Sequence, residues 1–557
     1  MKQHCQNCSS DFTILDDDLA MLKKLSPVVG ETTLHLPPPS LCPECRQQRR
    51  IAFRNDNHYY KNTCASCKKN VISIYSPDKG FTVYCHDCFW SDQWDGLTYG
   101  KDFDLSSSFF TQFSDLRKQV PRLCIFSTQS ENSDYTVHSS RNKNCYMGSS
   151  LIDDEEVYFS DFVFSSSDSV DCFSCERMQL CYSCVLCEDC YNGHWLTLCF
   201  NVTDGMLCFD CKGCKRVLGC VGKRNASNEI LNEKVQPEEF DRMSKKLLTD
   251  SVFRKEFEQK IETLRATVPV PNIWEIGSEN CTGNYLLHCK NVHQGYNGKH
   301  FEDCRYGFEG HKNTDCCDFM RCGNNELLYN CANIIELISG VCCNLTYQCS
   351  SMLYCDNCHS SKDCFGCFGI RNKRYCILNK QYTKEEYEAL VPKIVDAMRK
   401  EKTWGEFFPP ELSSFGYNES KANEWYPLDQ REALHRGWRW SEFEQALPDD
   451  LKAIDAKDIP DDIAEVPDDI LNFILRCAIS GKPYRLIPQE LAFYRKIGLP
   501  VPKEAPLTRM MALQKRQTSR TLHKRSCAKC SKPIETTYGP ERPEIVYCES
   551  CYLETVY

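Results

Sequence analysis

One four-cysteine motif occurs twice in this chain, and it constrains the fold of both ends. Each copy consists of two Cys-x-x-Cys pairs separated by seventeen residues, and an offset of 463 superposes the copies without a gap. Four thiolates in this spacing suit tetrahedral Zn²⁺, because each pair spans one edge of the tetrahedron. The residues between the pairs indicate strand, turn and strand, as in a zinc ribbon or treble clef. The predicted ligands are Cys64, Cys67, Cys85 and Cys88 in the first copy and Cys527, Cys530, Cys548 and Cys551 in the second.

A third zinc site is predicted at the amino terminus. Cys5 and Cys8 form one pair, Cys42 and Cys45 form the other after a gap of 33 residues, and Pro43 fixes the bend of the second pair. The same tetrahedral argument applies to these four thiolates. Residues 1–100 are therefore predicted to form a double zinc module, and we expect three Zn²⁺ ions per chain.

Length and cysteine content restrict the class of protein. A chain of 557 residues has room for three or more domains. It contains 41 cysteines, an odd number, and shows no secretory signal, so we expect a reducing cytoplasm in which close-spaced cysteines are metal ligands or small buried residues. No stretch approaches the roughly 20 apolar residues of a membrane span, so no membrane partner is expected.

Between the terminal modules, cysteines recur every nine residues. A fixed short period predicts a repeat structure, and the strand-rich composition makes it a β-solenoid with cysteines on an inner ladder. Two nine-residue arms per coil would stack like residues along the axis. The period is carried by Cys172, Cys181, Cys190, Cys199 and Cys208, and returns at Cys304, Cys322, Cys331, Cys349, Cys358, Cys367 and Cys376.

The solenoid is itself duplicated. The segment 208–240 matches 355–387 at an offset of 147, and both copies read Arg-Asn and then Ile-Leu-Asn before a helix. Pro237 is suited to a first helical turn, and Thr383 with Glu386 predicts a capping box. The expected order is solenoid half A at 101–235, a helical insert at 236–275 and half B at 276–382.

Two other roles for the core cysteines compete with that of buried thiols. The run Cys181, Cys184, Cys187 and Cys190 approaches a 4Fe–4S motif, but it has two residues rather than three before its last cysteine and no proline after it. Zinc or copper on the ladders, including Cys316–Cys317 and Cys342–Cys343, is a second alternative.

An acidic cluster raises the alternative of a polymer-cleaving β-helix enzyme. Asp153, Asp154, Glu155 and Glu156 are consecutive, but no paired partner for acid–base chemistry is identifiable, so a solvated turn is favoured. No catalytic motif occurs in a supporting context, and an enzyme ranks third among the functions considered.

Beyond half B, three further segments are expected. Residues 383–446 contain a helix and an aromatic-rich stretch, expected to pack against a solenoid face, and 447–475 are predicted to be an acidic linker. Residues 476–557 repeat the first module, but Ser480, Ala505 and Thr508 replace three of its first four cysteines. That zinc site is therefore predicted to be lost, leaving Cys477 as a buried thiol.

Basic residues accompany both terminal modules, although the net charge is −10. In the first module they form one helical face, with two interpretations: phosphate contact, or a solvated face beside anionic zinc centres. Residues 505–533 carry eight Lys or Arg and no acid despite the lost site, which favours phosphate contact. The acidic segment is an alternative, internal partner of this basic face. The candidates are Arg46, Arg49, Arg50, Arg54, Arg509, Arg516, Arg520, Lys524 and Arg525.

The layout resembles an uncharacterised family of bacterial multi-zinc-ribbon proteins. The resemblance is carried by Cys42-Pro43-Glu44-Cys45-Arg46, the stretch 74–85, Asn144-Cys145-Tyr146 and the closing segment 371–379, and it implies no activity.

The sequence thus predicts a mainly β fold, with a Cys-rich β-solenoid in two halves and helical segments, flanked by zinc-ribbon or treble-clef modules. The first function predicted is a zinc-stabilised nucleic-acid-binding factor, with structured RNA favoured. The alternative is a protein-interaction scaffold in which the zinc modules cap the solenoid.

Overall fold

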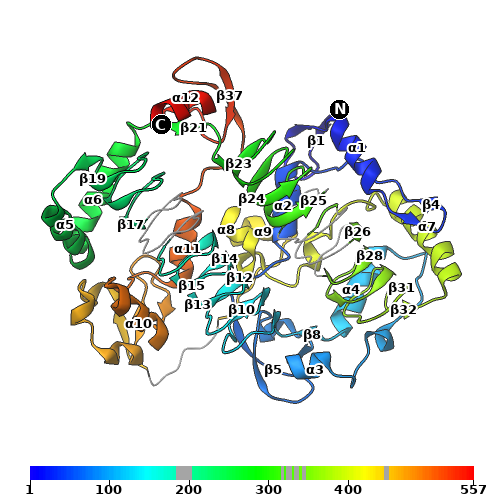
Figure 1. The fold of residues 1–557 in the computed structure, drawn as a ribbon. Coiled ribbons are helices and arrows are strands. Elements are labelled where there is room, and N and C mark those ends of the chain that lie inside the picture. The colour runs from blue at the N-terminus through cyan, green and yellow to red at the C-terminus, as the bar shows by residue number, and fades with distance from the viewer. Residues whose placement is uncertain (184–202, 315–318, 321–328, 332–337, 342–345, 445–450) are drawn as a thin grey trace. The chain divides into compact units, whose positions relative to one another are not determined.

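The computed structural model describes residues 1–557 except 184–202, 315–318, 321–328, 332–337, 342–345 and 445–450 (Figure 1). The chain divides into two compact units, each made of two stretches distant in sequence. Unit 1 comprises Met1–Ile125 and Trp274–Gln445, and unit 2 comprises Phe126–Ile273 and Ala446–Tyr557. The amino-terminal module therefore joins the second cysteine-rich segment, and the carboxy-terminal module joins the first.

The cysteine-rich segments form two stacks of short, mostly parallel strands, called stack A in unit 2 and stack B in unit 1. Stack A contains β9 (Ser127–Thr128), β10 (Thr136–Val137), β11 (Ser139–Ser140), β12 (Gly148–Ile152), β13 (Glu155–Tyr158), β14 (Asp161–Phe164), β15 (Ser167–Val170), β16 (Phe173–Glu176), β17 (Thr203–Met206), β18 (Lys215–Leu218), β19 (Ser227–Ile230) and β20 (Glu233–Lys234). Stack B contains β22 (Glu275–Ile276), β23 (Gly283–Leu287), β24 (Gly295–Glu302), β25 (Phe308–Thr314), β26 (Ile338–Val341), β27 (Thr346–Tyr347), β28 (Ser350–Leu353), β29 (Cys358–His359), β30 (Lys362–Phe365), β31 (Cys376–Ile377) and β32 (Lys380–Gln381).

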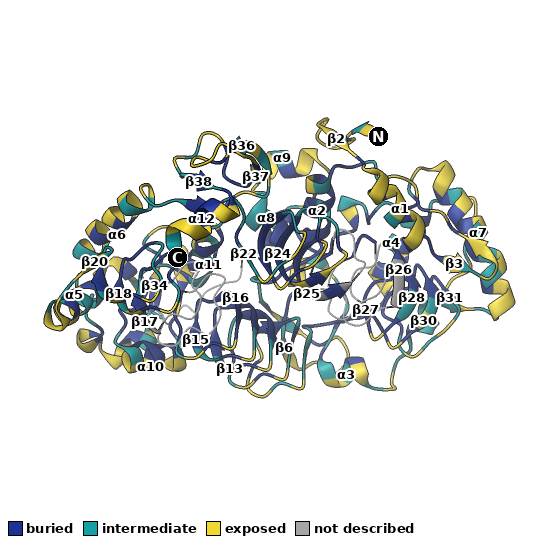
Figure 2. Cartoon of the chain, turned by 45° about the horizontal axis from the view of Figure 1, so that its top comes forward, coloured by how far each residue is buried: buried dark blue, intermediate teal, exposed yellow. Residues whose placement is uncertain are grey.

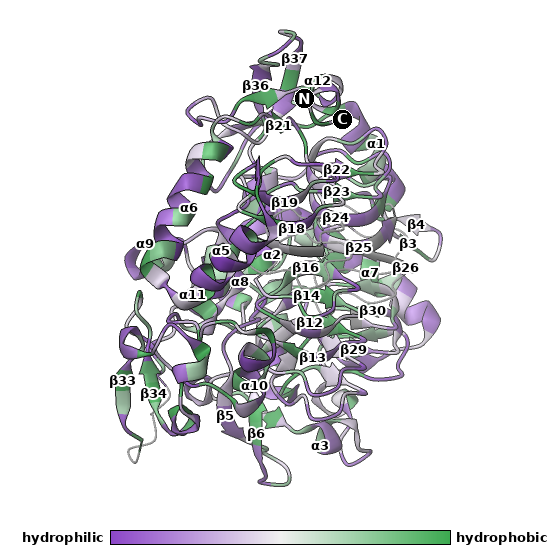
Figure 3. Ribbon diagram, turned by 60° about the vertical axis from the view of Figure 1, so that its left-hand side comes forward, coloured by the Kyte–Doolittle hydropathy of each residue, from purple (hydrophilic) through white to green (hydrophobic). Residues whose placement is uncertain are grey.

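The strand register in these stacks is twelve residues. In stack A, Ser149 pairs with Asp161, and Asp161 pairs with Phe173; in stack B, Ser350 pairs with Lys362. Figure 3 shows the rungs β22, β23 and β24 one beneath the next. Among the described parallel pairs of the two stacks, an eleven-residue step occurs only in the first coil of stack B, between β22 and β23 and at the bridge Glu279–Lys290. The expected coil of two nine-residue arms is therefore wrong: nine residues is a spacing within the stack, not the distance between rungs.

A three-residue pattern explains both numbers. Non-glycine residues with positive φ recur every third position, for example at Met147, Ser150 and Asp153. Such φ values are uncommon outside glycine, so their regular return bends the backbone at fixed intervals. Twelve residues are four such intervals and nine are three, so a cysteine spaced by nine keeps facing the same interior without lying directly above its predecessor.

The cysteine thiols lie inside the stacks and are hydrogen-bonded. Cys145 Sγ donates to the carbonyl oxygens of Lys143 and Asp154, both at 3.5 Å. Cys355 Sγ donates in the same way to the carbonyl oxygens of Leu353 and Cys364, at 3.4 and 3.6 Å. Both residues are at most 1% exposed. The predicted interior position of the cysteines is thus confirmed for these ladders, and a small thiol satisfies carbonyl groups that a methyl group would leave bare.

Each stack ends in an antiparallel strand and then a helix. β19 pairs with β20 and β31 pairs with β32. Stack A continues into α5 (Pro237–Thr249) and α6 (Ser251–Arg265), which Figure 2 shows exposed over much of their length, and stack B continues into α7 (Lys384–Lys400). Pro237 begins α5 and Thr383 forms the capping box with Glu386, as predicted.

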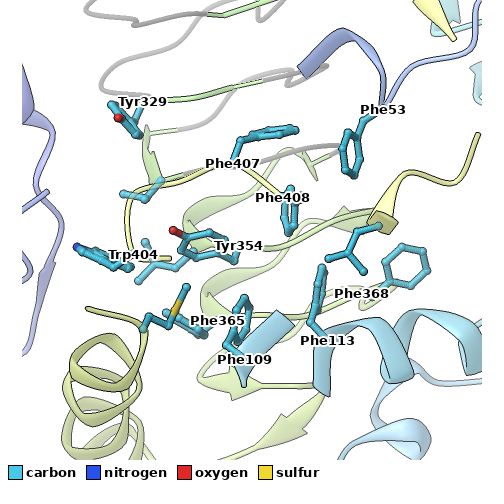
Figure 4. Packing of buried hydrophobic residues seen from close by; sticks show 14 of the residues in the cluster. Phe53, Phe109, Phe113, Tyr329, Tyr354, Phe365, Phe368, Trp404, Phe407 and Phe408 are labelled. Atoms are coloured by element: carbon cyan, nitrogen blue, oxygen red, sulfur yellow. The ribbon is translucent and has the colours of Figure 1, made fainter. Parts of the chain in front are cut away.

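An aromatic core joins four segments of unit 1 (Figure 4). Phe109 on α4 (Phe109–Gln119) packs on Tyr354 and Phe365 of stack B, with ring centroids 5.4 and 5.2 Å apart. Phe408, from the stretch after α7, stacks on Phe113 at 5.5 Å. The aromatic-rich segment therefore packs against stack B, as expected. The same segment contains α8 (Lys421–Trp425) and α9 (Gln430–His435).

The predicted acidic linker is instead part of unit 2. β33 (Ala453–Asp455) pairs with β34 (Ile474–Arg476), which pairs with β35 (Pro483–Tyr484). Short 3₁₀ turns between them bury Ile459, Ile463, Val466 and Ile470. Asp461 forms an ion pair with Lys503 at 2.7 Å and Asp468 pairs with Arg495, and both cations lie outside the basic stretch 505–533.

No helix in the described part of the chain combines the length and apolar composition needed to cross a bilayer.

Candidate metal centres

Three four-cysteine clusters can hold metal ions. In each, the four Sγ atoms lie within 4.8 Å of one another, and the residues are those predicted from the spacing. The sulfurs of Cys8 and Cys42 are 3.8 Å apart, and those of Cys67 and Cys85, like those of Cys530 and Cys548, are 3.7 Å apart. Two thiolates bound at about 2.3 Å to one tetrahedral ion would lie about 3.8 Å apart, so the clusters already have the size of a metal-bound tetrad.

The first pair of each cluster lies on a hairpin turn. The three hairpins are β1 (Lys2–His4) with β2 (Asp11–Thr13), β5 (Tyr60–Thr63) with β6 (Asn70–Ser73), and β36 (His523–Ser526) with β37 (Pro533–Thr536). The residue after the second cysteine is left-handed each time, with φ 60° at Ser9, 65° at Lys68 and 62° at Ser531. This turn directs both thiols to the same side of the hairpin.

The second pair of each cluster begins a helix. Cys42, Cys85 and Cys548 are the N-cap residues of α2 (Pro43–Ile51), α3 (His86–Trp90) and α12 (Glu549–Val556). Their backbone N–H groups donate to the first cysteine of the cluster, for example Cys42 N to Cys5 Sγ at 3.3 Å and Cys548 N to Cys527 Sγ at 3.2 Å. Hydrogen bonds of this kind favour the thiolate form that metal binding requires.

Each cluster contains at least one thiol with a lowered pKa, whereas the pKa is raised chiefly by burial at Cys85 and Cys551 and chiefly by the hydrogen bond with Cys42 at Cys45. Burial raises the pKa of Cys64, but the backbone N–H groups of Cys85, Cys67 and Ser66 outweigh it and bring the pKa down to about 6. The equivalent Cys527, subject to the same opposing effects, also has a pKa of about 6. A hydrogen bond from the Cys45 thiol is the largest cause of a lowered pKa at Cys42, about 7.

The carboxy-terminal module keeps the fold of a fourth cluster without its ligands. Gly481 follows Ser480 with φ 67°, and its N–H donates to the Cys477 carbonyl at 2.9 Å, as in the other three turns. Ala505 is the N-cap of α11 (Pro506–Gln514) in place of a cysteine, and Thr508 Oγ1 lies 3.7 Å from Cys477 Sγ. Cys477 is 4% exposed. Serine, alanine and threonine thus occupy three of the four positions that hold cysteine in the first module.

The basic face of the first module is turned inward. Arg46, on α2, donates to the Leu41 carbonyl at 2.8 Å. Arg50 donates to Asn330 Oδ1 at 2.7 Å. Arg54 and Arg46 are 3% and 6% exposed, and Arg50 is 1% exposed. Both predictions for these arginines, a phosphate contact and a solvated face, are therefore wrong. Helical periodicity shows that the arginines share one face of α2, but it does not show that other parts of the chain pack over that face.

The remaining basic candidates divide by exposure. Arg49 is 20% exposed and lies 3.7 Å from Glu406. Arg509 is buried and pairs with Asp171 at 2.6 Å, so it too is removed from the surface. Arg525 is half-buried and directs its guanidinium toward carbonyl oxygens of its own module. Arg520 is half-buried, and Arg516 and Lys524 are exposed.

Two arginines attach the metal-bearing modules to the stacks. In unit 1, Arg371 donates to the carbonyls of Phe89 and Ser91, at 2.6 and 3.0 Å, beside the Cys64 cluster. In unit 2, Arg224 donates to Tyr552 Oη at 2.9 Å, beside the Cys527 cluster. The duplicated Arg-Asn pairs contain this signal, because Arg224 and Arg371 match at the offset of 147. Sequence reasoning missed their role, since the sequence does not show which module meets which stack.

The acidic cluster is divided between a turn and a strand, because Asp153 and Asp154 lie between β12 and β13 and Glu155 begins β13. Asp153 pairs with Arg141 at 2.6 Å and Glu155 with Lys143 at 2.9 Å, each one rung away. Asp154 is 2% exposed, which corrects the expectation that the whole cluster is solvated.

The iron–sulfur alternative rests mostly on residues outside the described part of the chain. The second, third and fourth cysteines of that run, Cys184, Cys187 and Cys190, lie there, as do Cys316, Cys317, Cys342 and Cys343.

Comparison with known proteins found no matching family model, no matching curated protein and no matching solved structure.

Proposed function

We propose that this chain is a zinc-stabilised interaction scaffold, in which two β-solenoid halves present the binding surface and four-cysteine modules close their ends. The twelve-residue register, repeated from rung to rung, supports the solenoid interpretation. Thiolate-only tetrads of this size favour zinc over harder cations. A hairpin turn followed by a helix N-terminus supports the treble-clef interpretation of each module.

The observation that carries the proposal is the matched arginine contact. In both units a metal-bearing module is held to the last rungs of a stack through the same arginine of the repeat, Arg371 or Arg224. In unit 2 the arginine also pairs with buried Asp210 at 3.0 Å. At its outer edge the last parallel rung of each stack pairs, among the described strands, only with a two-residue antiparallel strand, β20 or β32, and a rigid module protects this short edge. The Cys64 and Cys527 clusters thus serve as end caps.

Metal content and local stability test this proposal together. Full-length protein should contain three zinc atoms per chain by mass spectrometry of the metal. A chelator that removes zinc should increase hydrogen exchange first at β19 and β31, the last parallel rungs. Iron in place of zinc, or unchanged exchange at both rungs after zinc loss, would refute the end-cap role.

Nucleic-acid binding remains a second candidate, restricted to the carboxy-terminal module. Its support is the exposure of Arg516 and Lys524 within the acid-free stretch 505–533. The variant Arg516→Ala with Lys524→Ala should weaken RNA binding and reduce its salt dependence by about two ionic contacts. The matched control is Lys143→Ala, an exposed lysine of stack A. Equal RNA affinity in both variants would exclude these residues from the interface.

A further inference from the structure

A cavity of about 270 Å³ lies beside stack B in unit 1. Its walls come from β28, β30, α7 and the hairpin of β3 (Val28–Val29) with β4 (Thr32–Thr33). Apolar groups are supplied by Val28, Leu353 and Tyr387, and cationic groups by Lys362, Arg374 and Lys384. A volume near 300 Å³ with apolar walls and a few polar groups is typical of a small-molecule site.

The cations of this cavity stand on adjacent rungs. Lys362 and Arg374 pair directly across the ladder, and both are exposed. Like charges directly opposite one another destabilise a sheet. On other rungs the outward ladder positions alternate in sign, as in Glu131, Lys143 and Glu155, with Lys212 opposite Arg224 as an exception. The Lys362–Arg374 rung departs from that arrangement.

Nearby carboxylates compensate this charge incompletely. Asp363 lies 3.6 Å from Arg374, and Glu388 lies 3.7 Å from Lys384. Both distances are at the long end for an ion pair. Among the described residues, Lys362 has no carboxylate within ion-pair distance. Three cations and two carboxylates therefore leave an excess positive charge at the cavity.

The equivalent position in stack A is closed. Residue 363 corresponds to Arg216 at the offset of 147. Arg216 pairs with Asp241 at 2.6 Å, donates to Asn228 Oδ1 at 2.9 Å and lies 4.4 Å from the centre of the Phe240 ring. The cavity in stack B therefore lies where Asp363 takes the place of this arginine and where the hairpin of β3 with β4 supplies a further wall.

A second like-charged rung in stack A supports this comparison. Lys212 is opposite Arg224, but Arg224 is neutralised by buried Asp210. Stack A therefore satisfies its adjacent cations internally, whereas stack B leaves its own beside a cavity.

We propose that this cavity is a binding site for an oxyanion, a phosphate or carboxylate, borne on a small aromatic or aliphatic body. The oxyanion lies between Lys362 and Arg374, where charge-assisted hydrogen bonds are available. The body lies against Leu353 and Tyr387. This site goes beyond the scaffold role and does not depend on which metal the cysteines hold.

Calorimetric titration of the zinc-loaded, full-length protein tests the site, with phenyl phosphate and benzoate as probes. At least one probe should bind with a stoichiometry of one and weaken as salt is raised. Tighter binding of phenyl phosphate would indicate a phosphate ligand, and tighter binding of benzoate would indicate a carboxylate ligand. Absence of saturable binding by both probes would overturn the proposal.

Three variants sharpen the test. Lys362→Ala with Arg374→Ala should weaken the tighter probe at least tenfold, whereas Arg141→Ala with Lys143→Ala, the matched outward cations of stack A, should leave it unchanged. Asp363→Arg reproduces the closed arrangement of stack A, and its guanidinium should occupy the cavity and reduce binding as strongly. Zinc content and circular dichroism confirm folding of each variant. Equal binding by Lys362→Ala with Arg374→Ala and the native protein would refute the site.

Discussion

Units 1 and 2 each combine a strand stack with a cysteine-containing module, but they differ in the number of metal clusters. Unit 1 contains two four-cysteine clusters, at Cys5 and Cys64, and the described part of unit 2 contains one, at Cys527. The turn at Cys477 nevertheless keeps its backbone conformation in unit 2. The hairpin and helix of the first cluster therefore persist where three of the four thiols have been replaced.

A buried ionic network accompanies the missing cluster. Arg509, which matches Arg46, is 7% exposed in its side chain and lies between Asp171 at 2.6 Å and Glu490 at 3.4 Å. Arg46 donates to the Leu41 carbonyl and lies 5.4 Å from the Tyr306 ring, just as Arg509 donates to the Glu504 carbonyl and lies 5.3 Å from the Phe159 ring. In both units, then, an arginine on the helix docks this part of the module on its stack. In unit 2 that arginine acts without an adjacent metal.

Loss of a metal cluster should have the largest effect on this comparison. Cys527→Ser with Cys530→Ser removes two ligands and should destabilise unit 2 by several kcal/mol, since structural zinc contributes about 10 kcal/mol or more to small domains. Cys477→Ser, at the turn that lacks a cluster, should cost about 1 kcal/mol. Denaturant unfolding in excess zinc measures both. Equal losses would indicate that Cys477 also holds metal.

The buried arginine of unit 2 should rank next. Arg509→Ala leaves two buried carboxylates unpaired and should cost about 3–5 kcal/mol. Arg46→Ala removes the hydrogen bond to the Leu41 carbonyl and the ring contact, among its other interactions, and we expect about 1–3 kcal/mol. Chemical unfolding of both variants, followed by hydrogen exchange in each unit, provides the measurement. A larger loss for Arg46→Ala would show that the ion pairs of Arg509 stabilise unit 2 less than the contacts of Arg46 stabilise unit 1.

The two end-cap arginines should have smaller, local effects. Arg371→Ala removes hydrogen bonds to carbonyls of the Cys64 module, and we expect about 1–2 kcal/mol. Arg224→Ala also leaves Asp210 buried and should cost somewhat more, about 2–3 kcal/mol. Hydrogen exchange at β31 and β19 reports each loss, with Arg141→Ala as an exposed control. Unchanged exchange at the last rung of either stack would show that its module is not a cap.

The smallest expected difference between the units is in how their unfolding free energies depend on pH, and its direction follows from Glu490. Burial raises the pKa of Glu490 to about 7, despite the opposing effect of Arg509. Because the folded state holds this proton more tightly than the unfolded state, the contribution is present at low pH and is lost as pH rises from about 4.5 through 7. The slope is at most about 1.4 kcal/mol per pH unit.

Substitution isolates this contribution. Glu490→Gln should remove that slope from the unfolding free energy of unit 2 between about pH 5 and 7.5, while Glu504→Gln, a nearby acid, should leave it in place. Retention of the native slope in Glu490→Gln would assign the pH dependence to other groups.

Local chemistry made the metal clusters predictable from the sequence. A Cys-x-x-Cys pair defines its own turn, so the twelve predicted ligands come together as three tetrads. Helix boundaries with strong local signals, such as Pro237 and Thr383, were equally accessible.

Other features depend on information that local patterns lack. The nine-residue cysteine spacing is a multiple of three, and it cannot distinguish a nine-residue from a twelve-residue repeat of the ladder. The burial of Arg50 results from α2 packing within unit 1, far from any sequence neighbour. Each terminal module belongs to the same unit as the stack that is more distant in sequence, and this pairing is likewise determined by tertiary contacts.

The three-residue pattern of the stacks restricts the insertions and deletions that the stacks can accept. Removing twelve residues from within a stack deletes one rung and leaves every later side chain facing as before. Removing one residue breaks the three-residue pattern within one coil, while later thiols keep their interior positions, as Cys289 and Cys304 do after the eleven-residue step. The one described eleven-residue step is the first coil of stack B, where no earlier rung of that stack is displaced. Natural variation in stack length should therefore proceed by whole rungs.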